Sequence, residues 1–169
     1  MKRVLTIAGS DSGGGASIQA DLKTITLLGG FGMSALTALT AQNTVTVAAI
    51  HDVPLDFVGA QIDAVFTDIG VDAVKTGMLA TEGVVKLVAS KIDQYKPPVV
   101  VVDPVMVAKS GDPLLTVEAQ QTLAQFLLPL ATLVTPNLPE ASALVGWEVR
   151  DENDMHRAAE EIHEMGPTY

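Results

Sequence analysis

The stretch VVVVDPVM, residues 99–106, decides how the rest of the chain is interpreted. Its four consecutive valines are β-branched and apolar on both faces, which is typical of a strand buried between two layers of a parallel α/β sheet. Pro104 lacks an N–H group, so the strand is predicted to end at Asp103. Ligands of open α/β sheets bind beyond the carboxyl ends of the strands. Asp103 is therefore a candidate site residue, although a carboxylate that merely caps the next turn would give the same local pattern.

Strand patterns alternate with helix patterns on both sides of this stretch. Apolar residues at helical spacing, such as Val58, Ile62, Val65 and Ile69, separate short runs of strand-forming residues. The alternation predicts an α/β fold, with a largely parallel sheet in three α/β/α layers and one domain over residues 1–169. The expected strands cover residues 4–8, 33–39, 45–50, 71–75, 99–103 and 133–134, and the expected helices cover residues 18–25, 58–69, 84–92, 119–127, 139–145 and 152–165.

The last four residues, Gly166-Pro167-Thr168-Tyr169, resemble the turn into a further strand. A doubly wound sheet rarely ends on the connection to its next strand. We therefore expect the fold to be truncated at its C-terminus.

Composition narrows the classes of partner and compartment. The formal net charge of −10 disfavours nucleic acid and anionic membranes as partners. Cysteine is absent, which excludes disulfides and thiolate metal sites. The sequence has neither a signal-peptide pattern nor an apolar run near the roughly 20 residues that cross a bilayer, so a cytoplasmic location is expected.

Polar or glycine-bearing segments follow five of the expected strands. Because the carboxyl ends of parallel strands share one edge of a sheet, these segments are expected to meet there. Their convergence predicts a ligand cleft at that edge. The segments are Gly9-Ser10-Asp11, Gln42-Asn43, Thr76-Gly77-Met78, Asp103 and Thr135-Pro136-Asn137.

The glycine-rich segment 9–15 matches neither common nucleotide motif. Gly9 and Gly14 have the spacing of a P-loop, but Gly15-Ala16 stands where that motif requires Lys-Ser/Thr. The dinucleotide motif also fails, because its last glycine is missing. The segment is predicted to be a flexible turn whose backbone can approach a flat ligand closely. Asp21, in the helix that follows, is a candidate site residue or a surface charge favoured by the helix dipole.

Asn137 and Glu140 begin a predicted helix and lie on one face of it. An amide and a carboxylate so placed suit a hydrated Mg²⁺ ion, which prefers oxygen ligands and retains waters. A capping box, in which Asn137 is the N-cap and Glu140 the third helical residue, explains the same spacing without a metal. Spacing alone leaves both interpretations open.

Several motifs occur together and in order, and the chain resembles the hydroxymethylpyrimidine/phosphomethylpyrimidine kinases of thiamine biosynthesis, which have the ribokinase fold. The resemblance extends over essentially all 169 residues. The matching motifs are Ala8-Gly9-Ser10-Asp11, Gln19-Ala20-Asp21-Leu22-Lys23-Thr24, Thr37-Ala38-Leu39-Thr40-Ala41-Gln42-Asn43-Thr44, Lys75-Thr76-Gly77-Met78-Leu79, Val102-Asp103-Pro104-Val105-Met106, Lys109-Ser110-Gly111-Asp112 and Thr135-Pro136-Asn137-Leu138-Pro139-Glu140.

The resemblance implies ATP- and Mg²⁺-dependent phosphorylation of 4-amino-5-hydroxymethyl-2-methylpyrimidine and then of its monophosphate. The positions that match the family's pyrimidine pocket are Gly9, Asp21, Gln42, Met78 and Val105. A glutamine suits this work because its amide both donates to and accepts from an aminopyrimidine edge.

The resemblance also implies a set of groups around the phosphates. Asp103 and Glu140 match the positions that organise the metal, and Asn137 and Glu140 match those near the nucleotide phosphates. Lys109 matches a loop residue expected to cover the phosphates, so Asp103 and Lys109 are the expected catalytic residues. Aligning these groups and neutralising charge is most of what phosphoryl transfer needs.

The match departs from the family's pattern in two respects. Thr40 stands where a small apolar residue is common, which makes one wall of the pocket more polar. The family's glycine-rich anion hole, its catalytic Cys or Asp and most of its adenine pocket lie past residue 169. The resemblance therefore implies that residues 1–169 alone are inactive.

Two other functions remain open, and they predict different activities. A pyridoxine or pyridoxal kinase shares the fold and the metal motif, although Gln42-Asn43-Thr44 together with Lys75-Thr76-Gly77-Met78 favours the pyrimidine branch. A non-catalytic module would retain the pyrimidine pocket without the anion hole. Family members are commonly dimers, which makes a homodimer the expected assembly.

Overall fold

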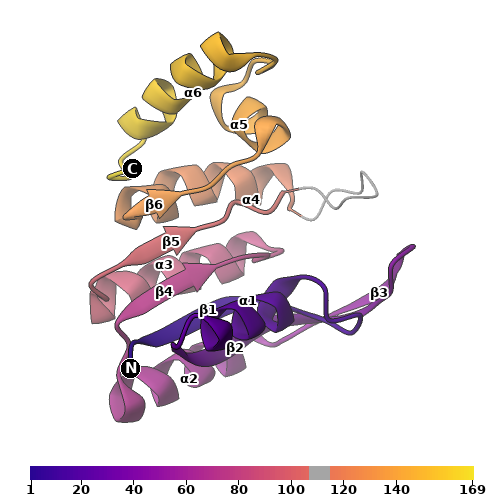
Figure 1. Cartoon of the computed structure of the whole chain (residues 1–169), viewed down its shortest axis with the longest axis vertical. Coiled ribbons are helices and arrows are strands. Elements are labelled where there is room, and N and C mark those ends of the chain that lie inside the picture. Colours follow the sequence, from indigo (N-terminus) through magenta and orange to yellow (C-terminus); the bar gives the residue numbers. More distant parts are fainter. Residues whose placement is uncertain (107–114) are drawn as a thin grey trace.

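A six-stranded, mostly parallel sheet with helices on both faces forms the centre of the protein in this computed structural model, which describes residues 1–106 and 115–169 (Figure 1). The strand order is β3-β2-β1-β4-β5-β6, and only the β2–β3 pairing is antiparallel. The predicted α/β class and layering are confirmed. Within the described ranges, no helix has the length and apolar character needed to cross a membrane.

The strands and helices follow the predicted order. The strands are β1 (Arg3–Asp11), β2 (Phe31–Gln42), β3 (Val47–Asp52), β4 (Ala73–Thr76), β5 (Val100–Val102) and β6 (Leu133–Val134). The helices are α1 (Ser17–Leu27), α2 (Leu55–Ala64), α3 (Glu82–Tyr95), α4 (Val117–Thr122), α5 (Leu138–Val145) and α6 (Glu152–Glu164). Wider π-helical turns continue α2 over Val65–Ile69 and α4 over Leu123–Leu127, and a 3₁₀ turn follows at Leu128–Leu130.

The valine strand is shorter than predicted and asymmetric between its faces. Val100 and Val102 are buried in the main core, whereas Val101 on the opposite face is only half-buried and Val99 is exposed outside the strand. The strand thus lies between two layers, as predicted, but its burial is complete only on the core face. Asp103 does follow the strand directly, as predicted.

The first two strands extend further than the sequence indicated. β1 continues through Gly9 to Asp11, because Ser10 and Asp11 pair with Leu39 and Thr40 of β2 after a register shift. A strand ending at residue 8 was expected, since glycine and polar residues follow. Backbone pairing with β2 keeps these residues extended in spite of their weak strand propensity.

Helices cover the two faces of the sheet unequally. Figure 1 shows α1 over β1 and β2 on one side, and α2, α3 and α4 in a row on the other. The main core fills the space between the sheet and this row. Strand residues on the core face include Leu5, Ile7 and Val74, so their neighbours Thr6 and Lys75 lie on the α1 face.

A second, smaller core packs α5 and α6 beside β6. Beyond α6, Thr168 donates its N–H to Ala131, Tyr169 donates its N–H to Thr132, and Val134 donates to Tyr169. The bonds at Tyr169 have the pattern of a parallel pairing with β6. The last residues thus run alongside the sheet edge, as the sequence pattern predicts.

Candidate active site

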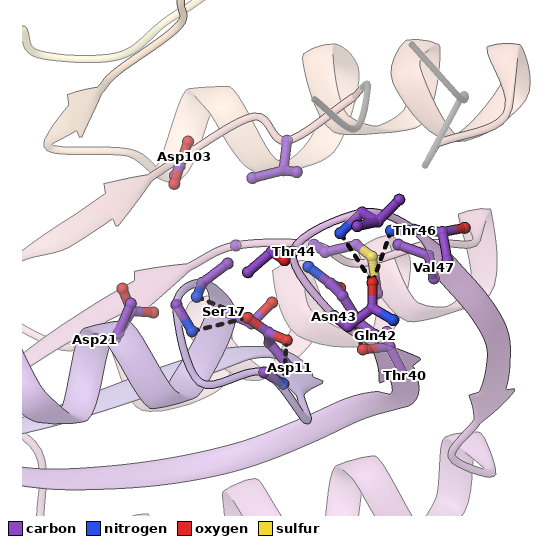
Figure 2. A pocket seen from close by; sticks show the side chains of 18 of the residues that line it. Asp11, Ser17, Asp21, Thr40, Gln42, Asn43, Thr44, Thr46, Val47 and Asp103 are labelled. Carbon is purple, nitrogen blue, oxygen red and sulfur yellow. Dashed lines mark hydrogen bonds between the residues drawn. The ribbon is translucent and has the colours of Figure 1, made fainter. Parts of the chain in front are cut away.

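A cavity of about 670 Å³ opens at the carboxyl ends of β1, β2, β4 and β5 (Figure 2). Its walls come from the glycine-rich segment, from the end of β2 with the loop that follows, and from the first residues after β4 and β5. The predicted convergence of strand exits is therefore confirmed for four of the five segments. The fifth, Thr135-Pro136-Asn137, does not line the cavity.

Asp11 holds the glycine-rich segment in place. Its buried carboxylate accepts hydrogen bonds from the N–H groups of Gly13 at 2.7 Å and of Gly15 and Ala16 at 2.9 Å (Figure 2). Gly14 has a φ of +75°, which glycine adopts without strain. Three backbone donors on one carboxylate thus give the glycine-rich segment a defined turn conformation.

Gln42 reaches the cavity from the end of β2. Its backbone N–H donates to the Ser12 hydroxyl at 2.8 Å, and that hydroxyl donates to the Gln42 carbonyl at 2.6 Å. The Thr40 hydroxyl donates to the Ser10 carbonyl at 2.9 Å and lies 3.2 Å from Oε1 of Gln42. Thr40, which departs from the family's pattern, therefore makes this wall polar, and its single O–H donates to the Ser10 carbonyl in preference to the more distant Gln42 oxygen.

Asn43 shapes the loop that follows Gln42. Its side-chain oxygen accepts the N–H groups of Val45 at 2.8 Å and Thr46 at 3.0 Å, a local turn that replaces secondary structure. Figure 2 shows this loop curving over the end of the cavity that holds Gln42. The loop and Gln42 thus form one end of the site.

Met78 and Val105 add apolar side chains to the lining of the cavity. Met78 is 6% exposed and packs against Gly9, where an added Cβ would lie 2.7 Å from the Met78 methyl carbon. Gly9 is therefore behind the methionine and does not itself line the cavity. Its smallness lets Met78 take up this position.

An ion cluster forms the floor of the cavity. Nζ of Lys75 lies 3.2 Å from Oδ2 of Asp21 and 3.1 Å from Oδ2 of Asp103. The buried Thr6 hydroxyl also donates to Oδ2 of Asp21, at 2.6 Å. Asp21 and Asp103 thus line the cavity, as predicted, from two sides of one lysine.

Asn137 and Glu140 form the capping box that their spacing allowed. The Asn137 side chain accepts the Glu140 N–H at 3.0 Å, and Oε2 of Glu140 accepts the Asn137 N–H at 2.9 Å. Glu140 is only 5% exposed, and neither residue lines the cavity. Burial raises the pKa of the Glu140 carboxyl and the charge of Asp103 acts in the same direction, whereas N–H groups of Asn137 and Met106 oppose the rise.

For the raised pKa of Glu140, the charge of Asp103 is a smaller cause than burial. Among the described residues, however, no group of three metal-ligating side chains is assembled. Lys109, Ser110, Gly111 and Asp112 lie outside the described residues. The roles of Asp103, Glu140 and Lys109 at the phosphates therefore stay predictions.

Two residues at this site were missed at the level of sequence. Lys75 stands in a motif that matches the family, but the resemblance implies no role for it, and the sequence predicts Asp11 only as part of a segment that follows a strand. A charged side chain in the middle of a buried strand is a usable signal for Lys75. For Asp11 the signal is an aspartate two residues before a glycine run, since aspartate side chains commonly accept nearby backbone N–H groups.

The model of the family described as phosphomethylpyrimidine kinase matches residues 11–169. The chain belongs to this family.

Relatives in the family cover nearly all of this chain. The hydroxymethylpyrimidine/phosphomethylpyrimidine kinases of Escherichia coli and Mycobacterium tuberculosis are 50% and 53% identical to it over 169 and 168 residues, or 98% and 99% of its length. A bifunctional thiamine biosynthesis protein of Geobacter sulfurreducens is 58% identical over 163 residues, which are 96% of this chain and 33% of that protein. The chain spans 64% of the Escherichia coli kinase and 61% of the Mycobacterium tuberculosis kinase.

Solved structures of the family and its neighbours have the same fold. A phosphomethylpyrimidine kinase of Clostridium difficile superposes with a TM-score of 0.93 at 47% identity, over 99% of this chain and 72% of that one. A pyridoxal kinase of Staphylococcus aureus in complex with ADP superposes with a TM-score of 0.90 at 41% identity, over 99% and 61%. The sheet and its cavity thus belong to a ribokinase-like kinase fold.

Proposed function

We propose that the protein containing this chain phosphorylates 4-amino-5-hydroxymethyl-2-methylpyrimidine and its monophosphate, using ATP and Mg²⁺. The observation that carries the proposal is the cavity itself. Gln42 presents a carboxamide on one side, Asp21 and Asp103 share Lys75 on the other, and Met78 and Val105 add apolar lining. That arrangement suits a flat, polar-edged ring whose hydroxymethyl group reaches the charged side.

At the ring end, Gln42 reads the aminopyrimidine edge by donating from its NH₂ group and accepting at its carbonyl. Met78 and Val105 pack on the faces of the ring, and Gly9 makes room for Met78. Asp21 projects from α1 on the Lys75 side of the cavity, across from Gln42, and would contact the ring from there. Removing water from such a pocket strengthens each of these polar contacts.

At the phosphate end, the donor types fit Mg²⁺, because carboxylate oxygens are its preferred protein ligands. Asp103 lines the cavity, and its charge contributes to the raised pKa of the Glu140 carboxyl. We propose that these two carboxylates hold the ion, which supplies charge neutralisation at the phosphates when bound. Asn137 fixes Glu140 through the capping box, and Lys109 covers the phosphates.

The nucleotide in this proposal is ATP, in keeping with the ADP and AMP-PCP complexes of Staphylococcus aureus pyridoxal kinase. Residues of this chain align the acceptor hydroxyl and place negative oxygen ligands around the phosphates. Alignment and electrostatic stabilisation account for most of the catalysis of phosphoryl transfer. The group that takes the hydroxyl proton is expected outside residues 1–169.

Pyridoxal kinase activity is the second candidate, and the similarity of this chain to pyridoxal kinases in sequence and structure favours it. Pyridoxal kinases of Bacillus subtilis and Staphylococcus aureus are 45% and 41% identical to this chain, with TM-scores of 0.91 and 0.90. A structure described as the last common ancestor of HMPPK and PLK/HMPPK vitamin kinases is 55% identical over 100% of this chain. Dual activity is consistent with the same pocket, since both substrates are flat rings bearing a hydroxymethyl group.

The test is a kinase assay with the pyrimidine alcohol, its monophosphate and pyridoxine side by side. We expect the full-length protein to phosphorylate the first two faster than pyridoxine. Residues 1–169 alone should show no detectable turnover. A full-length protein that prefers pyridoxine would replace the first candidate with the second.

Calorimetry on residues 1–169 with the pyrimidine alcohol tests the remaining alternative, a non-catalytic protein that only binds the pyrimidine. A non-catalytic pyrimidine-binding function requires binding without turnover in both the short chain and the full-length protein. The expected homodimer is tested on the full-length protein by light scattering at several concentrations.

A further inference from the structure

Lys75 occupies a position in this cavity that the proposed function does not use. It lies on β4, between β1 and β5 in the sheet, and projects on the face that carries α1. Its ammonium contacts Asp21 at 3.2 Å on one side and Asp103 at 3.1 Å on the other. The exposed fractions of the three side chains are 24%, 19% and 33%, so the cluster is largely shielded from solvent.

The surroundings of Lys75 keep space for its ammonium. At Gly77, an added Cβ would lie 3.3 Å from Nζ of Lys75 and 3.0 Å from the Cβ of Ala8. Both distances are tighter than ordinary van der Waals contacts. Glycine at position 77 therefore lets the lysine end lie flat across the floor of the cavity.

Lys75 could attract a phosphate directly or could position a neighbouring carboxylate, and the net charge of the cluster decides between these two roles. Among the described residues that line the cavity, the charged side chains are Asp11, Asp21, Asp103 and Lys75. Asp11 is committed to the backbone of the glycine-rich segment. The remaining ammonium is shared by two carboxylates, so the cluster keeps a net negative charge and does not attract a phosphate by itself.

The two carboxylates depend on Lys75 to different degrees. Asp21 retains a second anchor, the Thr6 hydroxyl at 2.6 Å on the same oxygen. For Asp103, Lys75 is the only side-chain partner among the residues that the structure describes. Without the ammonium, two carboxylate oxygens that both lie within 3.2 Å of one nitrogen would face each other unscreened.

We propose that Lys75, held between Asp21 and Asp103 on the cavity floor, is a positioning residue that fixes the carboxylate of Asp103 for phosphoryl transfer. This inference rests on the proposed kinase function. Lys75 does not contact the transferred phosphate. It acts through Asp103 by orienting one carboxylate oxygen and by cancelling the repulsion from Asp21.

The test replaces Lys75 with methionine, which keeps the apolar stem and removes the charge, in the full-length protein. We expect kcat for the pyrimidine alcohol to fall about 10- to 100-fold, the usual range for a residue that orients a functional ligand. The Kd of the pyrimidine alcohol, measured by calorimetry, should change less than about threefold, because Thr6 still holds Asp21. The double variant with Asp103→Asn should be no slower than Asp103→Asn alone.

Lys91→Met is the matched control. Lys91 is also a shielded lysine, 17% exposed and paired with Asp63 at 2.6 Å, but it lies on α3 beside α2 and away from the cavity. This variant should lose stability without losing kcat per folded molecule.

Three outcomes would overturn the proposal: a normal kcat in Lys75→Met after correction for the folded fraction, losses that add fully in the double variant, or a loss confined to the Kd of the pyrimidine. A wild-type protein that fails to phosphorylate the pyrimidine would instead overturn the proposed function, before any variant is compared.

Discussion

Two lysine–carboxylate clusters on opposite faces of the sheet are built in opposite ways. On the α2–α3 side, Lys91 contacts both oxygens of Asp63, at 2.6 and 2.7 Å, and the Tyr95 hydroxyl donates to the same carboxylate at 2.7 Å. Donors there exceed acceptors, and the charges of the ion pair cancel. On the cavity floor one ammonium is shared by two carboxylates, and a negative charge is left over.

The Asp63 cluster joins helices, whereas the cluster on the cavity floor is part of a candidate binding site. The Asp63 cluster is complete without any ligand, and Tyr95 stacks on Phe66 with ring centroids 4.4 Å apart to tie α3 to the turn after α2. The cavity-floor cluster has an unbalanced charge beside an open cavity, which a bound cation would neutralise. We therefore expect substitutions in the first cluster to change stability and substitutions in the second to change activity.

The largest effect is expected from Asp103→Asn in the full-length protein. Loss of this carboxylate charge should lower kcat about 100-fold, as for other single electrostatic groups in active sites. The midpoint of urea unfolding should change little, because Asp103 is partly exposed and follows the end of β5. A variant with normal kcat and lower stability would make Asp103 a turn-capping residue.

Gln42→Leu should have the next largest effect and extends the comparison to the other end of the cavity. An amino group of the bound pyrimidine would lose its partner, at a cost of about 1–3 kcal/mol, so the Kd measured by calorimetry should rise about tenfold or more. The affinity for ATP should stay the same.

Gln61→Leu is the matched control for Gln42→Leu. Its carboxamide pairs with both the N–H and the carbonyl of Leu36, at 2.9 and 3.1 Å, on the α2 side. This variant should lower stability and leave pyrimidine affinity unchanged. Equal Kd values for wild type and Gln42→Leu would remove Gln42 from the pocket.

Glu140→Gln is expected to affect both quantities, each to a smaller degree. Glutamine at this position also accepts the Asn137 N–H, so only the favourable charge at the helix N-terminus is lost and the free energy of unfolding should fall by less than about 1 kcal/mol. The fall in kcat should be smaller than that of Asp103→Asn, and the Mg²⁺ concentration needed for half-maximal rate should rise. If only stability changes, Glu140 serves the capping box and not the metal.

The smallest effect concerns the pH dependence of the Asp63 cluster. Hydrogen bonds from Lys91 and Tyr95 lower the pKa of the Asp63 carboxyl in the folded protein. Its stabilising contribution is therefore present at neutral pH and is lost as the pH falls through about 4, the ordinary value for aspartate, and below. Because Asp63 is 40% exposed, solvent screening limits that contribution to about 0.5 kcal/mol.

Asp63→Asn should therefore destabilise the protein most at neutral pH, and the difference from wild type should shrink towards pH 3. Urea unfolding of both proteins at pH 7, 5 and 3.5 measures this. A difference that grows on acidification would contradict the lowered pKa.

Sequence patterns predicted well which polar residues follow each strand, because both the strand and the residues after it are determined by local sequence. Asp21, Gln42, Met78, Asp103 and Val105 all line the cavity, as expected from the exits and from the family resemblance. Local patterns could not place Gly9 behind Met78, because that contact depends on the pairing of β1 with β4, the strand that precedes Met78. They also left the choice at Glu140 open, because a capping box and a metal ligand require the same spacing.

The sequence by itself determined the α/β class, the parallel sheet and the edge at which polar groups collect, because hydrophobic periodicity and strand-ending residues are written along the chain. Only the tertiary structure decided which of the segments that follow the strands lie next to each other. β4 lies beside β1 and not beside β3, its predecessor in the chain, and this order brings Lys75 between Asp21 and Asp103. Strand order follows from burying the apolar faces of all helices and strands at once, so residues 21, 75 and 103 meet through packing that no single segment specifies.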